Sequence, residues 1–124
     1  MPPSAFNYDY TSLLGRRVTL LRGGESEGFD RYFPRKARVR RQLALDDWGS
    51  DWLVLDLEEP FDFETIRVEY CLVRARWYGN PIGSEPCAVF VLFDPKGVLD
   101  SKSQWSSADF YFVAWGMIQV DTLS

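Results

Sequence analysis

The chain has 124 residues, of which 46% are hydrophobic and 16% aromatic, enough for one globular domain with its own core, and its formal net charge is −4. It contains no histidine, which removes the usual general base near neutral pH, the Ser–His and Cys–His nucleophile pairs and the commonest zinc ligand. We therefore expect a protein that is not an enzyme and that carries no cofactor and no metal.

Short segments with the period-two pattern of strands follow one another, with turn residues between them. In the second of these segments, for example, Val39 alternates with Arg38 and Arg40. The last two segments are apolar on both faces, as expected of strands that are covered on both sides. The predicted strands are 14–22, 37–45, 52–57, 65–78, 88–93 and 110–120.

The segment 65–78 changes the parity of its apolar positions between Leu72 and Val73. Such a change predicts either a β-bulge or a strand that passes from one packing layer to another. Helical pattern is confined to a short turn within 5–13 or 100–108. The sequence thus predicts a single all-β domain over 1–124. We expect a six-to-seven-strand, mostly antiparallel barrel or sandwich with at most one or two short helical turns, and residues 1–13 as an N-terminal arm packing on it.

Two cysteines, Cys71 and Cys87, are expected on neighbouring strands around a loop near 79–85. That arrangement places Cys71 opposite about residue 93 and Cys87 opposite about residue 77, too far apart for a disulfide. Reduced thiols suit a reducing compartment. No apolar run approaches the ~20 residues of a membrane span, and the first residues lack the layout of a signal peptide. We expect a cytoplasmic protein without membrane contact.

Charge is distributed unevenly along the chain: residues 31–45 carry six basic and no acidic side chains, and residues 46–64 carry eight acidic and no basic ones. A hairpin register that keeps the apolar residues on one face places Arg40 opposite Asp56 and Arg38 opposite Glu58. Cross-strand pairs of this kind contribute about 0.2–1 kcal/mol each, so they favour a register more than they stabilise the fold. Arg41 is the exception, because this register places it on the inner face.

The acidic segment and the net charge predict a non-catalytic module that docks another protein, with a basic partner favoured. An inhibitor or immunity-type protein against a toxin enzyme is one form of this hypothesis. Trp48 and Trp105 lie in polar stretches and are expected as exposed interface anchors, whereas Trp52, Trp77 and Trp115 are expected in the core. The predicted partner-binding residues are Asp46, Asp47, Trp48, Asp51, Glu58, Glu59 and Trp105. Self-assembly as a homo-oligomer through 110–120 is the alternative within this class.

Two alternatives come from other classes. The first is a single-stranded nucleic-acid-binding barrel that combines cations with stacking aromatics, although the net acidity disfavours it. Its residues would be Arg31, Tyr32, Phe33, Arg35, Lys36 and Arg38. The second is a barrel whose mouth, lined by Trp and Tyr, holds a small apolar or sugar ligand.

Two groups of carboxylates are candidates for other chemistry. The group of Asp46, Asp47 and Asp51 with Ser50 does not have the spacing of a calcium loop, and turn formation explains its composition. No spacing singles out an acid and base pair for glycoside hydrolysis among Glu58, Glu59, Asp62 and Glu64.

Overall fold

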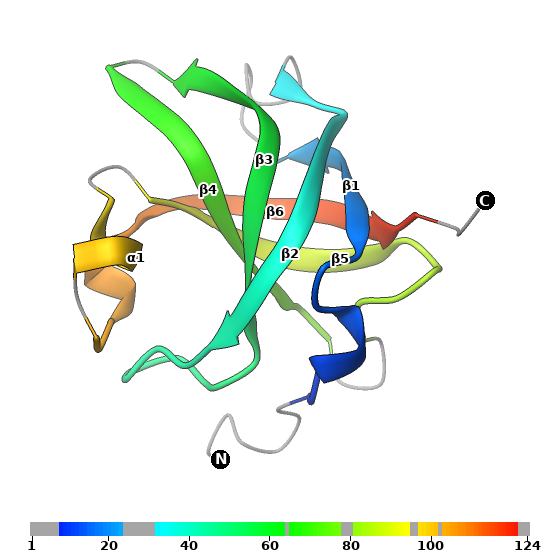
Figure 1. Ribbon diagram of the computed structural model, residues 1–124, viewed down its shortest axis with the longest axis horizontal. Coiled ribbons are helices and arrows are strands. Elements are labelled where there is room, and N and C mark those ends of the chain that lie inside the picture. The colour runs from blue at the N-terminus through cyan, green and yellow to red at the C-terminus, as the bar shows by residue number, and fades with distance from the viewer. Residues whose placement is uncertain are drawn as a thin grey trace.

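The computed structural model describes residues 8–23, 32–63, 65–77, 81–94, 97–101 and 103–121, with the side chains of 22, 23, 63, 66 and 111–115 outside that description. Six strands run through these residues in chain order (Figure 1). They are β1 (Arg17–Gly23), β2 (Arg35–Leu43), β3 (Trp52–Phe63), β4 (Ile66–Ala75), β5 (Cys87–Phe93) and β6 (Tyr111–Val120).

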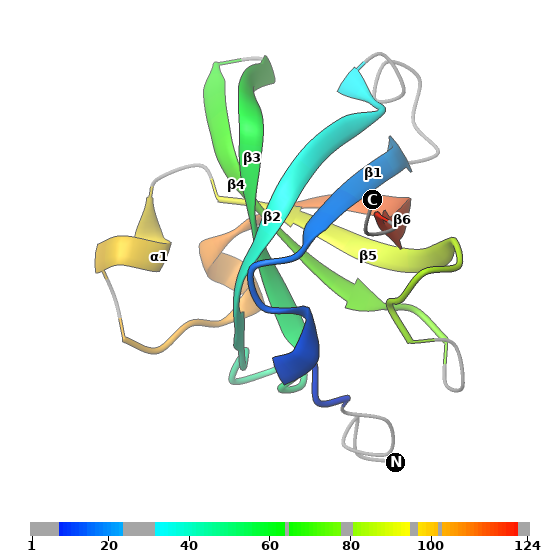
Figure 2. The same cartoon turned by 45° about the vertical axis from the view of Figure 1, so that its right-hand side comes forward.

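The six strands form one closed antiparallel barrel in which every strand pairs with its neighbours in sequence. The closing contact joins β6 to β1, with Val18 opposite Val120 and Leu20 opposite Ile118. Figure 2 shows β1 crossing β6 and β5 on the far side of the molecule from α1. The predicted all-β fold is confirmed, and of the two predicted architectures the chain adopts the barrel.

Helical structure among the described residues is limited to short pieces. These are a 3-10 helix at Thr11–Leu13, the helix α1 (Val98–Ser101) and a 3-10 helix at Ser107–Asp109. The α1 helix begins where the buried carboxylate of Asp94 accepts hydrogen bonds from the amides of Val98 and Leu99, at 3.0 and 3.3 Å. No helix in the described part of the chain has the length and hydrophobicity that a bilayer crossing requires.

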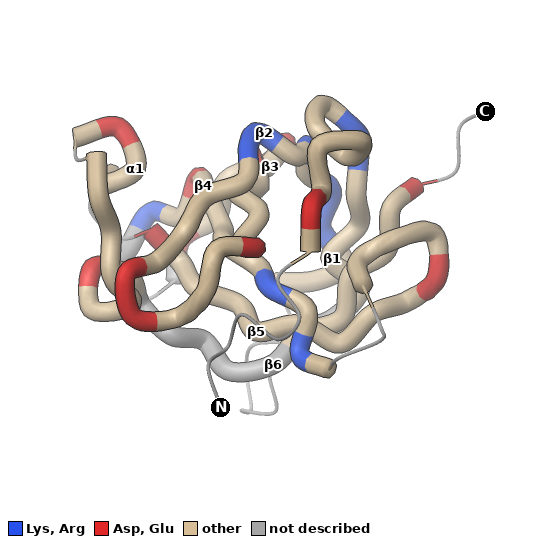
Figure 3. The backbone as a smooth tube through the Cα atoms, turned by 90° about the horizontal axis from the view of Figure 1, so that it is seen from below, with Lys and Arg blue, Asp and Glu red and all other residues tan. Residues whose placement is uncertain are grey.

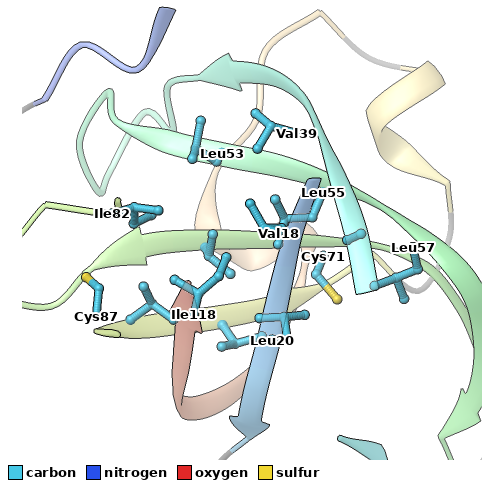
Figure 4. Packing of buried hydrophobic residues seen from close by; sticks show 14 of the residues in the cluster. Val18, Leu20, Val39, Leu53, Leu55, Leu57, Cys71, Ile82, Cys87 and Ile118 are labelled. Carbon is cyan, nitrogen blue, oxygen red and sulfur yellow. The ribbon is translucent and has the colours of Figure 1, made fainter. Parts of the chain in front are cut away.

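The barrel interior is filled by apolar side chains from all six strands (Figure 4). Leu53 and Leu55 are fully buried there, and the side chains of Tyr10 and Phe61 are also part of this cluster. Residues 8–13 pack across one opening, where the amide of Ile82 donates to the Tyr10 hydroxyl at 3.2 Å. The interior is therefore a packed core.

A second apolar layer covers the outside of β3, β4 and β5. Trp52, Leu72 and Leu92 point outward from these strands and are fully buried. The segment that follows β5 covers them, with Leu99, Trp105 and Phe110 in the same cluster. This layer explains why the β5 sequence is apolar on both faces, and Figure 1 shows α1 and its flanking turns standing beside the barrel.

The predicted register of the β2–β3 hairpin is wrong. Leu43 pairs with Trp52 and Arg38 with Asp56, and the register shifts between Val39 and Arg41. The prediction assumed that all apolar residues of this strand share one face. In the structure Val39 points into the barrel and Leu43 into the outer layer, while Arg41 is exposed. A register irregularity is what allows one strand to serve both layers.

The predicted parity change in the fourth strand is present but lies earlier. Val68 and Cys71 both belong to the interior cluster, so the strand changes phase between them. The opposing strand has its own register shift there, between Asp56 and Phe61. From Cys71 onward the strand is buried on both faces, which is why Leu72 and Val73 are both apolar.

Both cysteines are free and buried. Cys71 lies opposite Phe93, as predicted, and Cys87 lies at the start of β5. Burial raises the pKa of both thiols, that of Cys87 to about 11, so they remain protonated at neutral pH. These cysteines are packing residues.

Truncation of one interior side chain tests the closed core. We expect Leu55→Ala, at a fully buried position, to lower the free energy of unfolding by about 2–5 kcal/mol because it leaves a cavity that the barrel cannot close. Leu14→Ala is the control, since Leu14 is 45% exposed, and it should cost less than about 0.5 kcal/mol. Equal losses in chemical denaturation would contradict this description of the core.

Candidate functional site

The turn between β2 and β3 is held against the segment that follows α1. Within the turn, the Leu45 amide donates to the Gly49 carbonyl at 2.9 Å, and Gly49 has a φ of +85° that favours glycine. Across to the other segment, the Asp46 amide donates to the Trp105 carbonyl at 2.8 Å. Residues distant in sequence therefore form one surface.

Asp47 links the β2–β3 turn to the segment that follows α1. Its carboxylate accepts hydrogen bonds from the Ser107 amide at 2.8 Å and from the Ser107 hydroxyl at 2.5 Å. These two bonds lower the pKa of Asp47 below its ordinary value. Asp47 is therefore charged at neutral pH, and its charge is committed to the contact between the two segments.

The two tryptophans expected as exposed anchors are not free on the surface. Trp105 is only 9% exposed, and its indole N–H donates to the Val98 carbonyl at 3.0 Å. Trp48 is half-buried, with its ring centroid 5.1 Å from that of Trp52 and 5.0 Å from that of Phe90. Both belong with the outer apolar layer, because that layer needs large side chains to cover β3, β4 and β5.

Asp51 is also misplaced by the sequence prediction. It is fully buried and pairs with Arg74, which is itself only 2% exposed, at 2.5 Å between Nε and Oδ1. The amide of Tyr8 donates to its second oxygen at 3.3 Å. Asp51 therefore cannot reach a partner, and the signal that was missed is an arginine inside an otherwise apolar run, "CLVRA".

An open pocket of about 510 Å³ lies between the β2–β3 turn and the segment after α1. We call it the turn pocket, and it is lined by Asp46, Ser101, Ser103, Gln104, Trp105, Ser106 and Asp109. The described part of this lining contains two carboxylates and no Lys or Arg. Asp46 is exposed, whereas the Asp109 carboxylate accepts a hydrogen bond from the Ser106 amide at 3.0 Å.

Most of the turn pocket was missed at the level of sequence. Only Asp46 and Trp105 were singled out, and the serines and Gln104 belong to a polar stretch, "SKSQWSSAD", that has no pattern of its own. Their placement depends on a long-range contact, the parallel bridge between Leu45 and Trp105. In Figure 3 the end of the molecule that carries α1 is rich in acidic segments.

Glu58 and Glu59 do not join this surface. They line a separate pocket of about 300 Å³ with Arg17, Arg35 and Lys36, so acidic and basic candidates meet at the same place. Arg17 donates two hydrogen bonds of 2.8 Å to Glu58, and this pair lowers the pKa of Glu58. The charge of Glu58 is thus paired with Arg17, a residue that was not among the candidates.

The basic candidates Arg35, Lys36 and Arg38 all form hydrogen bonds or ion pairs within the chain. Arg35 donates to the Glu59 carbonyl at 2.6 Å, Lys36 pairs with Asp121 at 2.9 Å, and Arg38 donates to the Gly15 carbonyl at 3.2 Å. Figure 3 shows basic segments along β2.

The aromatic candidates of that segment, Tyr32 and Phe33, pack against another ring of the chain. Tyr32 stacks on Phe61 with ring centroids 4.8 Å apart, and Phe33 meets the edge of the same ring. Arg31 lies outside the described residues, as do Glu64 and the side chain of Trp115.

The prediction for Trp77 is wrong. This residue was expected in the core and is 56% exposed, with the Arg76 guanidinium 4.8 Å from its ring centroid. β4 ends at Ala75, so Trp77 has left the sheet by the time its side chain would turn inward. Trp52, in contrast, is fully buried as expected.

No protein-family model, curated protein or solved structure matches this chain. Within the described residues, no group of three or more His, Cys, Asp or Glu side chains is arranged to hold a metal ion. The turn pocket is therefore the candidate site, on the strength of its own residues.

Acidification tests the Asp47–Ser107 contact. Because the folded-state pKa of Asp47 is lowered, its stabilisation is present above the ordinary carboxyl pKa and is lost as the pH falls through the folded-state value. We expect Ser107→Ala to melt about 1–2 °C below the wild-type chain at about pH 6, with the difference vanishing by about pH 2.5. A difference that is independent of pH in thermal melts would contradict this role.

Proposed function

We propose that this chain is a non-catalytic protein-binding module that docks a basic partner at the turn pocket. The observation that carries the proposal is the described part of the pocket lining: two carboxylates, three serine hydroxyls and an amide, with no cationic side chain among these described residues. A lysine or arginine side chain is rich in donors and has no acceptor, so it complements carboxylates of this kind. An inhibitor or immunity-type protein remains one form of this proposal.

Three features of the chain support a binding role over catalysis. There is no histidine, and both cysteines are buried with raised pKa values. The carboxylates of the turn pocket are the exposed Asp46 and the half-buried Asp109. Neither of them is fully buried, so among the described residues the pocket lacks the enclosed carboxylate on which general acid catalysis at neutral pH usually depends. A cytoplasmic setting is part of the proposal, and the two free thiols support it.

Hydrogen bonds hold the two sides of the pocket together, and a preformed surface of this kind favours docking. Its two sides are joined by the backbone bond between Asp46 and Trp105 and by the side-chain contact between Asp47 and Ser107. Trp105 is one of the lining residues, and the Arg41 guanidinium lies 4.7 Å from its ring centroid. Because that ring is buried and already has a guanidinium over it, a sugar has little aromatic face on which to stack.

The alternatives have less support. A nucleic-acid arm needs cations free for phosphates, whereas Lys36 pairs with Asp121 and both Arg35 and Arg38 donate to backbone carbonyls. Self-assembly by strand addition needs an unpaired edge, and β6 pairs with both β5 and β1. A ligand inside the barrel would compete with the apolar side chains that fill it.

Charge reversal at the pocket tests the proposal. The measurement is affinity capture from lysate with the wild-type chain, Asp46→Lys and Asp62→Lys, after nuclease treatment and at about 0.1 M and 0.5 M salt. Asp62 is a matched control, since it is exposed and lies at the far end of β3. We expect a stoichiometric protein that wild type and Asp62→Lys retain at low salt, and that Asp46→Lys loses by at least about tenfold.

Two outcomes would contradict the proposal. Retention of the partner by Asp46→Lys would show that the turn pocket is not the docking surface. Captured material that disappears with nuclease would instead support the basic segment and the nucleic-acid alternative.

A further inference from the structure

The buried ion pair between Asp51 and Arg74 has no obvious purpose in stability. Both side chains are almost completely removed from water, at 0% and 2% exposure. Removing two charges from water costs about as much as their attraction returns, and apolar residues of similar volume often stabilise a fold as well or better. A buried ion pair of this kind can instead serve to hold a neighbouring part of the backbone in place.

The guanidinium of Arg74 lies directly beneath the turn between β2 and β3. A methyl group added to Gly49 would lie 3.0 Å from the central carbon and 3.0 Å from one terminal nitrogen of that guanidinium. Contacts this close mean that the backbone of the turn rests on the flat face of the arginine side chain. The absence of a side chain at Gly49 is what allows the approach.

Asp51 binds the same guanidinium through its Nε. It is the last residue before β3, and its carboxylate holds Nε of Arg74, which projects from β4. One carboxylate thus ties the end of the turn to a neighbouring strand, while the guanidinium supports the middle of the turn. The planar, rigid fork of arginine suits this double role better than the flexible, compact ammonium of lysine.

The contact extends from Gly49 to the turn pocket through two hydrogen bonds. The Gly49 carbonyl accepts from the Leu45 amide, and the adjacent Asp46 amide donates to the carbonyl of Trp105, a lining residue of the pocket. We infer that Arg74, held by Asp51, is the positioning residue that fixes the β2–β3 turn and so preforms the turn pocket. This inference rests on the proposed function for its biological meaning, but it concerns a placement that is measurable without a partner.

Hydrogen exchange of the turn amides provides the test, with Gly49→Ala as the first variant. Its new methyl group meets the guanidinium and leaves Arg74 and Asp51 unchanged. Gly15→Ala is the matched control, because Gly15 has a similar φ of +81° and no atom within 4 Å of the added methyl group. Any cost of positive φ to the stability of the whole barrel then appears in both variants, and Arg74→Met tests the turn without a change of φ.

We expect the amides of Leu45 and Trp48, which are bonded within the turn, to exchange at least about tenfold faster in Gly49→Ala than in wild type. Amides of the central strands, such as Leu55 and Val91, should change by less than about threefold. Gly15→Ala should leave the turn amides unchanged. Arg74→Met should reproduce the loss in the turn, and Arg74→Lys should restore it only in part.

The inference is overturned if the turn amides keep their protection in both Gly49→Ala and Arg74→Met. It is also overturned if Gly49→Ala accelerates exchange equally across the barrel, because the contact would then be one of general stability. The capture experiment with Asp46→Lys involves neither Arg74 nor Gly49, so failure of the docking surface is distinguishable from failure of this positioning role.

Discussion

Closure of the sheet between β1 and β6 is the constraint on which the rest of the molecule depends. Because β6 pairs with β5 on one edge and with β1 on the other, the barrel offers no unpaired strand along its circumference. Its interior is filled by side chains. The proposed docking surface is therefore formed by a turn and by the segment between β5 and β6, where the turn pocket lies.

The segment between β5 and β6 has two roles in this account. Its apolar residues Leu99 and Phe110 cover the outer faces of β3, β4 and β5, and its polar residues form one wall of the turn pocket. The other wall is the β2–β3 turn, which rests on Arg74. The same segment therefore covers the outer layer and forms part of the pocket, so a substitution that disturbs its packing also disturbs the pocket.

Much of the fold was predictable from the sequence, because strand boundaries depend on local alternation and turn residues. All six predicted strands are present, and Cys71 lies opposite Phe93 as expected. The site was predictable only in part. Asp51 and Trp105 are buried by partners distant in the chain, namely Arg74 and the outer layer, and no local pattern reveals such partners. Asp46 was found because it is simply an exposed acid in a turn.

The central claim, that the acidic groups around the turn pocket meet a basic partner, is tested most directly by zero-length carbodiimide cross-linking. This reagent joins a carboxylate to a lysine only where the two are in contact, and mass spectrometry of the complex then identifies the carboxylates involved. The account predicts cross-links from Asp46 and Asp109, which line the turn pocket. Cross-links confined to Glu58, Glu59 and Asp62, at the other end of β3, would contradict it.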